Sequence, residues 1–160
     1  VVNYIFTIDF PQNITQVHFI KLRLFDTKGK EVANTFYWRS NDKYEGRKTL
    51  TGPTSSGFED LSKLKQVQLK TRYQTYQEGD RHFIKAEIKN PSSTVAFFTQ
   101  LQLLGQDKKP VRPSFYTDNF FSLLPGESKT VIIETAASDM PSEPTFVVKG
   151  WNIKPSSFKL

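Results

Sequence analysis

The chain has 160 residues, enough for one ordinary core or for one domain and part of a second. It contains no cysteine, which excludes disulfides, thiol catalysis and thiolate metal sites. The formal charge of +6 would favour anionic partners, but the lysines and arginines stand singly between apolar residues, as on the solvated faces of strands. No nucleic-acid partner is therefore predicted.

The composition favours many short strands. Aromatic residues make up 14% of the chain, with 14 Phe, and they stand beside 9 Pro and 8 Gly. No apolar run approaches the roughly 18 residues that span a bilayer, so no membrane partner is predicted. The chain opens on VVNYIFTIDF, which is typical of a strand inside a domain. We therefore expect a piece of a longer protein.

The N-terminal residues are predicted to form the last strands of an incomplete sandwich domain. Apolar and polar side chains alternate over residues 2–9, which predicts a strand. They alternate again over residues 20–24, and Phe19 breaks the phase, which suggests a β-bulge there. A turn at residues 26–30 then leads into a returning strand over 32–38.

A complete domain is predicted after a linker. Polar, Gly and Pro residues over 40–56 indicate a linker or long loop. The sequence FEDLSKLK at 58–65 predicts a short helical turn, with acidic residues early and lysines late. Short strands separated by turn signals then indicate an immunoglobulin-like sandwich, at residues 66–74, 82–89, 95–104, 110–117, 120–124, 128–136 and 144–153.

The predicted fold class is all-β: an antiparallel immunoglobulin-like β-sandwich, preceded by a few strands from a truncated neighbouring sandwich. The expected domains are the incomplete sandwich (1–45), the linker (46–57), the complete sandwich (58–153) and a tail (154–160). Residues 19–37 also align with residues 98–116, which favours two related modules in tandem. The alternative is that any two hairpins of similar length share such patterning.

No catalytic constellation stands out in the sequence. His18 and His82 lack companion ligands at a metal-binding spacing, and there is no nucleophile elbow or glycine-rich phosphate loop. A glycosidase needs two carboxylates in a cleft, one as general acid and one as nucleophile. No pair of acidic residues in this sequence stands out for these two roles. We therefore predict no catalytic residue, no metal and no cofactor.

Aromatic residues are the more informative side chains. Neighbours in a strand face opposite ways, so one ring of each aromatic doublet is expected in the core and the other at the surface or at a domain interface. Flat rings can also stack on a sugar. The residues predicted to contact a sugar or a neighbouring domain are Trp38, Tyr116, Asp118 and Trp151. Packing is favoured over sugar binding, and Asp118 and Asn119 are favoured as loop stabilisers.

One segment resembles a known family. The run FYTDNFFSLLPGESKTV at 115–131, preceded by VAFFTQLQLL and followed by VKGWNI, resembles the C-terminal sandwich domain of glycoside hydrolase family 2 enzymes. The closest subset is the exo-β-D-glucosaminidase and β-mannosidase branch, including mannosylglycoprotein endo-β-mannosidase. The run HFIKLRLFDTKGKEVANTFYWRSN at 18–41 resembles the end of the preceding sandwich, and FEDLSKL resembles the element that opens the last domain.

The resemblance implies a role without chemistry of its own. In that family the catalytic glutamates lie on a (β/α)8 barrel, and nothing in this sequence resembles that barrel. It implies a non-catalytic accessory domain of a family 2 glycosidase that hydrolyses β-mannosides or β-glucosaminides, with sister domains as partners and a periplasmic or secreted location. Two alternatives stay open: a carbohydrate-binding module that takes an oligosaccharide, and an extracellular adhesion-type domain.

The truncation has a consequence of its own. If residues 1–45 are the end of an incomplete domain, their apolar faces lack their original partner. These strands should then dock on the second module, dimerise through their exposed edges, or fray.

Overall fold

The computed structural model describes residues 5–41 and 57–160. The chain divides into two compact units, Val1–Lys63 and Leu64–Leu160. The described residues form antiparallel sheets and two short 3-10 helices, so the predicted all-β fold is confirmed. Neither helix in these ranges is long and apolar enough to cross a membrane.

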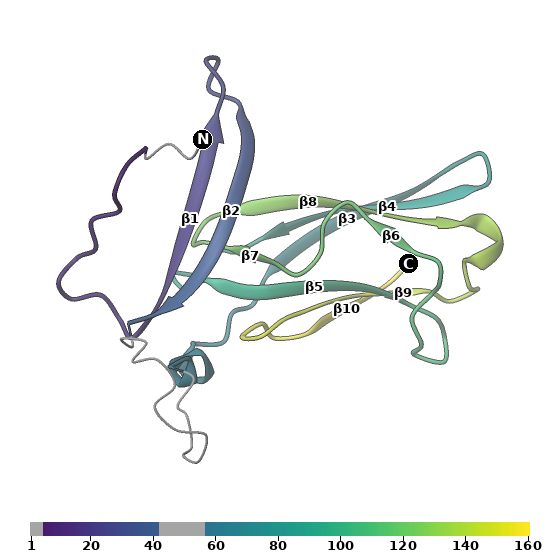
Figure 1. The fold of residues 1–160 in the computed structure, drawn as a ribbon. Coiled ribbons are helices and arrows are strands. Elements are labelled where there is room, and N and C mark those ends of the chain that lie inside the picture. Colours follow the sequence, from purple (N-terminus) through teal and green to yellow (C-terminus); the bar gives the residue numbers. More distant parts are fainter. Residues whose placement is uncertain (1–4, 42–56) are drawn as a thin grey trace, which may run out of the picture. The chain divides into compact units, whose positions relative to one another are not determined.

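The first unit contains a hairpin of β1 (Val17–Phe25) and β2 (Glu31–Ser40), drawn in purple and violet-blue in Figure 1. Asp26 closes its turn, because Oδ1 accepts hydrogen bonds of 2.9 Å from the backbone N–H groups of Lys28 and Lys30. Gly29 stands between them at φ +78°, a conformation that favours glycine. The predicted turn is confirmed.

Two predictions for this unit are wrong. Residues 5–9 form no strand. Alternating apolar and polar side chains are not enough for a strand, and no strand of the described residues pairs with this segment. Residues 2–4 of that predicted strand lie outside the described residues. The bulge lies beside the turn and not at Phe19: Leu24 faces Ala33 and Phe25 faces Glu31, which leaves Val32 as the extra residue.

The short helical turn predicted at 58–65 is present as η1 (Glu59–Lys63), a 3-10 helix. Lys63 Nζ lies 2.6 Å from Asp60 Oδ1, one turn earlier, and this contact raises the pKa of the lysine. Most of the predicted linker, residues 42–56, lies outside the described residues.

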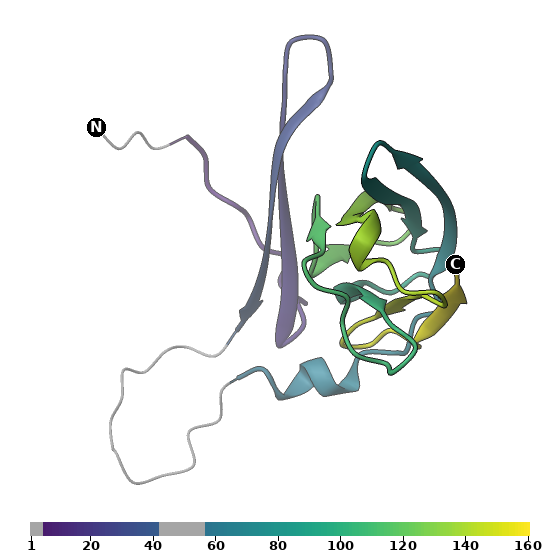
Figure 2. The same ribbon diagram turned by 90° about the vertical axis from the view of Figure 1, so that its right-hand side faces the viewer.

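The second unit is a sandwich of two four-stranded sheets. One sheet has the order β3 (Lys70–Glu78), β4 (Arg81–Lys89), β8 (Ser128–Ala136), β6 (Phe115–Tyr116). The other has the order β10 (Ser156–Lys159), β9 (Thr145–Lys149), β5 (Ala96–Leu104), β7 (Phe121–Leu123). A second 3-10 helix, η2 (Ala137–Asp139), follows β8. Figures 1 and 2 show the two sheets as facing layers.

Alternation along the strands builds the core between these layers. Alternate residues of β4 from Ile84 and of β8 from Val131 point inward and are buried, as are alternate residues of β5 and β9. The inward side chains that are almost fully buried include Ile84, Ile88, Leu101, Leu103, Val131, Ile133, Phe146 and Val148. Burying such side chains contributes roughly 1.5–3 kcal/mol each.

The ends of the sandwich differ from the sequence prediction. Residues 156–159, in the predicted tail, form β10, in which Phe158 faces Phe146 of β9. The strand predicted at 110–117 shrinks to β6, because Pro110 and Pro113 cannot donate to a ladder. The aligned segments 19–37 and 98–116 also differ in pairing: β1 pairs with β2, whereas β5 and β6 belong to different sheets.

Candidate functional site: an aromatic cluster at one end of the second unit

The segment between β6 and β7 carries the chain from one sheet to the other, and its side chains hold both. Tyr116 Oη accepts a 2.9 Å hydrogen bond from the Leu103 N–H in β5. Asn119 brackets Leu101 of the same strand, with Oδ1 accepting at 2.8 Å and Nδ2 donating at 3.0 Å. On the opposite sheet, Thr117 Oγ1 accepts from the Ile132 N–H at 3.0 Å. The segment that carries the family resemblance is therefore a clamp between the sheets.

Asp118 and Tyr116 have their polar groups engaged within this clamp. The Asp118 carboxylate accepts a 2.7 Å hydrogen bond from the Asn119 N–H and forms an ion pair with Lys129. Burial raises the pKa of the Tyr116 hydroxyl, and its hydrogen bonds with Leu103 and Ser114 partly offset that rise. Both residues contribute to the architecture of the loop.

Two phenylalanines next to the clamp stand in the left-handed region. Phe98 and Phe120 both have φ of +57°, which costs a non-glycine residue about 1–2 kcal/mol. Hydrogen bonds hold this geometry: the Phe98 N–H donates to Ser122 Oγ at 3.2 Å, and the Phe120 N–H donates to Asn119 Oδ1 at 3.1 Å. Their rings lie 5.5 Å apart. Strain of this kind often marks functional positions.

Trp151 is displayed beside them by its two neighbours. A Cβ on Gly150 would lie 2.4 Å from Ile153 Cδ1 and 2.8 Å from the Phe98 carbonyl oxygen, so only glycine fits. Asn152 is buried, and its amide accepts from the Phe97 N–H at 2.8 Å and donates to the carbonyls of Lys65 and Val95. The tryptophan between these fixed residues is 59% exposed.

These side chains form what we call the aromatic cluster: Phe97, Phe98, Phe120 and Trp151. Strand register places them at the same end of the β9–β5–β7 sheet, because Thr99 faces Phe121 and Gln100 faces Lys149. Phe97 is buried beneath, 5.6 Å from the Phe98 ring and 6.5 Å from Trp151. Phe98 and Phe120 are 39% and 49% exposed. Such a surface suits apolar packing or stacking on a flat ligand.

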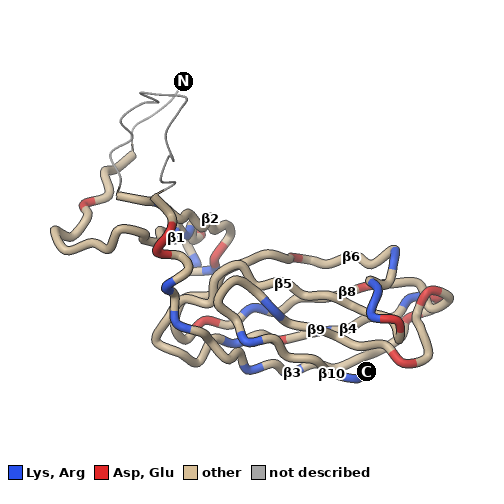
Figure 3. Tube along the Cα trace, turned by 90° about the horizontal axis from the view of Figure 1, so that it is seen from below, with Lys and Arg blue, Asp and Glu red and all other residues tan. Residues whose placement is uncertain are grey.

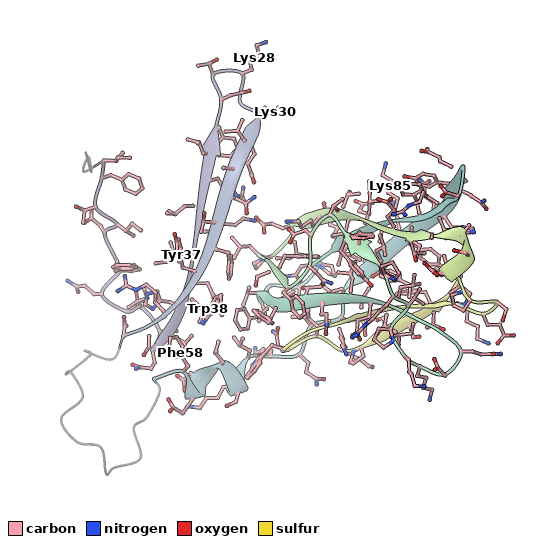
Figure 4. The ribbon with its side chains drawn as sticks, turned by 45° about the vertical axis from the view of Figure 1, so that its right-hand side comes forward. Lys28, Lys30, Tyr37, Trp38, Phe58 and Lys85 are labelled. Atoms are coloured by element: carbon pink, nitrogen blue, oxygen red, sulfur yellow. The ribbon has the colours of Figure 1, made fainter. Side chains whose placement is uncertain are left out.

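Only one of the four residues predicted to make a sugar or domain contact belongs to the cluster. Trp151 is part of it, whereas Tyr116 and Asp118 belong to the clamp segment. Trp38 lies in the first unit on β2, is 43% exposed and faces Phe19 across the hairpin. In Figure 4 Trp38 and Tyr37 point to opposite faces of β2, as alternation requires. The contacts predicted for all four residues stay predictions.

Sequence reasoning missed Phe98. An aromatic doublet such as Phe97 and Phe98 indicates that one of its two rings lies at the surface. The register shift between Ala96 and Thr99, where Phe98 turns outward, has no signature in the sequence. The histidines lie in different units, with His18 buried in β1 against Phe10 and His82 on β4. In the two described ranges, no group of three or more His, Asp or Glu side chains could hold a metal ion.

Three comparisons with known proteins bear on this arrangement. The family described as the exo-β-D-glucosaminidase Ig-fold domain matches residues 49–153. An exo-β-D-glucosaminidase of Streptomyces avermitilis is 30% identical over 149 residues, and one of Amycolatopsis orientalis is 27% identical over 157 residues. These alignments cover 87% and 91% of this chain but only 16% and 15% of the relatives.

Solved structures show the same fold. The exo-chitosanase CsxA of A. orientalis superposes with a TM-score of 0.77 at 23% identity, over 93% of this chain and 19% of that one. The complex of one of its single-residue variants with PNP-β-D-glucosamine gives a TM-score of 0.79 at 22% identity, with the same coverage. The clamp and the displayed Trp151 both fall inside the matched residues, and the chain belongs to the exo-β-D-glucosaminidase Ig-fold domain family.

Proposed function

We propose that this chain is a non-catalytic accessory region of a longer glycosidase of the exo-β-D-glucosaminidase type, and that the aromatic cluster packs against a sister domain. The observation that carries the proposal is the family match over residues 49–153 together with the 16% share of the relatives' length. The two named relatives support a β-glucosaminide rather than a β-mannoside as the substrate of the longer protein.

The site supports packing more than chemistry. The cluster presents three exposed ring systems, and the Asp118 carboxylate beside it is paired with Lys129. Hydrogen bonds with Ser122 and Asn119 hold Phe98 and Phe120 in strained left-handed backbone conformations. The free energy of this strain is not offset if the two rings contact only solvent. Contact with an apolar protein surface would offset that strain by burying the rings.

The absence of catalysis is tested with the 160-residue chain and p-nitrophenyl β-D-glucosaminide. We expect no release of nitrophenol above the buffer rate. Saturable turnover that co-purifies with the chain through two different columns would contradict the proposal. The β-mannoside is run in parallel, since turnover of that substrate alone would move the chain to the mannosidase branch.

The packing role is tested with Phe120→Gly in two contexts. In the 160-residue chain this variant relieves the left-handed strain and should leave thermal stability unchanged or slightly higher. In the longer protein encoded by the complete reading frame it should lower the melting temperature. Phe115→Ala, which removes an exposed ring outside the cluster, is the matched control. Equal effects of Phe120→Gly in both contexts would contradict docking of the cluster.

A carbohydrate-binding role is the second candidate, and the exposure of Trp151 is the observation that favours it. Because the chain has two tryptophans, Trp38→Phe makes Trp151 the sole reporter. Titration of this variant with glucosamine oligosaccharides should give a flat fluorescence response at millimolar ligand if the cluster serves packing. A saturable change in emission would favour sugar binding instead.

A further inference from the structure

The outer face of the sheet β3–β4–β8–β6 carries a concentrated positive charge. Side chains of alternate residues on β3 and β4 share this face, and the register places Lys70 opposite Lys89, Arg72 opposite Glu87, and Gln74 opposite Lys85. Four of these residues form what we call the basic face: Lys70, Arg72, Lys85 and Lys89. Figure 3 shows several blue positions along these strands, and Figure 4 labels Lys85 on the outer side of its strand.

The basic face is hollowed rather than flat. One hollow of about 440 Å³ is lined by Lys70, Arg72, Glu87, Lys89, Pro91 and Gly126. A second, of about 370 Å³, is lined by Arg72, Tyr73, Gln74, Lys85, Glu87 and Thr130. The two hollows share Arg72 and Glu87 and therefore adjoin. Across them, four cations meet a single carboxylate.

Three of these cations have no carboxylate opposite them in the neighbouring strands, and the fourth, Arg72, faces Glu87. In the described part of the chain, none of the four lies within ion-pair distance of a carboxylate. Lys70 and Lys89 stand directly opposite each other, and like charges at such a position destabilise a sheet. The arrangement therefore lowers the stability of the domain, which calls for another explanation.

Protection of a sheet edge accounts for only part of it. Lysine on an edge strand discourages strand addition from another chain, and β3 is an edge strand. The strand β4, however, lies inside the sheet between β3 and β8. Lys85 and Lys89 therefore protect no edge, and their charge adds to that of β3 on one surface.

The geometry points to an extended ligand with repeated carboxylates. Side chains on one face of a strand repeat roughly every 6.7 Å, and alternate side chains of an extended peptide have the same repeat. Tyr73 offers no ring to a sugar here, because it packs on Phe146 and Phe158 and donates its hydroxyl proton to the Lys159 carbonyl. The half-buried rings of Tyr76 and Phe83 do lie on this outer face, with centroids 5.0 Å apart, but they stand beyond Gln74 and Lys85 and line neither hollow.

We propose that the basic face binds an extended acidic protein segment with Asp or Glu at every second position. Arg72 and the lysines pair with the carboxylates. This site is separate from the aromatic cluster and needs no sister domain. Its affinity depends on salt, because exposed charges are screened beyond about 10 Å at 0.1 M ionic strength.

The test uses the 160-residue chain and two labelled peptides of equal composition. One alternates Glu and Thr over twelve residues, and the other places six Glu before six Thr. Fluorescence anisotropy at low salt should show tighter binding of the alternating peptide, and binding should weaken as salt rises. Equal affinity for the two peptides would overturn the proposal, because it would show attraction without a matched repeat. Tighter binding of heparin than of the alternating peptide would overturn it in favour of a sulfated glycan.

Paired variants locate the site. Lys70→Gln with Lys89→Gln should weaken binding of the alternating peptide about tenfold, the product of two exposed ion pairs. Lys28→Gln with Lys30→Gln removes the same charge from the hairpin turn of the first unit and should leave binding within twofold. Similar losses in both double variants would overturn the proposal, because net charge alone would then explain them. Circular dichroism checks that both variants keep the sheet signal.

Discussion

Single side chains hold together distant parts of the second unit, and Asn152 is the clearest case. Its buried amide joins the backbone of Lys65, Val95 and Phe97, which lie 87, 57 and 55 residues away. No apolar side chain could satisfy these three groups, and a buried polar group left unpaired costs about 1–3 kcal/mol. The neighbouring Trp151 depends on this anchor for its orientation.

We expect Asn152→Ala to lower the free energy of unfolding by roughly 3 kcal/mol, because three backbone groups lose their hydrogen-bond partner at once. Urea denaturation followed by circular dichroism measures this change. Gln77→Ala removes an exposed amide that donates to the Gly79 carbonyl and should cost less than about 0.5 kcal/mol. A loss for Asn152→Ala as small as that of the control would show that water replaces the amide.

Tyr116 gives the clamp a dependence on alkaline pH. Burial raises the pKa of its hydroxyl above the ordinary 10.0, so the folded state holds the proton more tightly than the unfolded state. Below about pH 10 both states are protonated and the contribution is constant. As the pH rises further, the unfolded state loses its proton first, and stability is lost until the folded hydroxyl also ionises.

Tyr116→Phe should therefore be less stable than the wild type by about 1 kcal/mol at neutral pH, because the Leu103 N–H loses its acceptor. The difference should narrow above pH 10, where only the wild type carries the penalty. Urea midpoints at pH 8 and pH 10.5 measure both effects. If the difference in stability between the wild type and Tyr116→Phe is the same at both pH values, the raised pKa of Tyr116 is contradicted.

At the scale of elements, Lys70 on β3 and Lys89 on β4 stand directly opposite each other, and their repulsion destabilises the sheet that they make positively charged. We expect Lys70→Glu to raise the free energy of unfolding by roughly 0.2–1 kcal/mol, because it replaces a repulsion with an attraction to Lys89. Thermal unfolding at low and high salt measures the gain, which should shrink as salt screens the charges. A loss of stability would show that Lys70 makes a favourable contact in solution.

Strand prediction succeeded where alternation and turn chemistry agreed. The strand at 128–136 was predicted with the observed bounds, because Val131, Ile133 and Thr135 alternate after the turn at Pro125 and Gly126. β10 was missed, since its four residues carry one apolar ring and are defined by pairing with β9. Residues 5–9 show the converse, a clear alternation without a partner strand. The alternation of apolar residues indicates which face of a segment could be buried, whereas hydrogen bonding to a neighbouring strand decides whether the segment forms a strand.

The candidate site was predictable only in part, for the same reason. The sequence of the FYTDNF segment favours Asn119 as a loop stabiliser, a role that its contacts with Leu101 fit. That Tyr116, Thr117 and Asn119 reach two different sheets depends on the crossing between β6 and β7, which no periodicity encodes. The left-handed conformations of Phe98 and Phe120 likewise arise from tertiary hydrogen bonds.

At the scale of the whole molecule, the first unit is the weak point. Its described sheet has two strands, so each is an edge, and it exposes Leu22, Leu24, Phe25 and Val32. An isolated two-stranded hairpin is marginally stable in water. Exposed edges and apolar side chains together favour association of two copies.

We expect the apparent mass of the chain in light scattering to rise with concentration. Val32→Lys, which places a charge in the bulge of β2, should suppress that rise, because edge lysines oppose strand pairing. Thr130→Lys adds the same charge to the outer face of the second unit and serves as the control. A monomeric mass up to millimolar protein would show that the hairpin finds no partner in solution.

The anchor at Asn152 also bears on how this domain is made. The first residues of the second unit are fastened by its last ones, through the Asn152 amide and through the parallel bridge between Val67 and Ile153. At about 5–20 residues per second, a ribosome needs roughly 4–17 s to add the 87 residues from Lys65 to Asn152. During that interval the early strands wait without their final neighbours, exposed to chaperones and proteases. The early strands of this unit therefore reach their final neighbours only after Asn152 and Ile153 have been made.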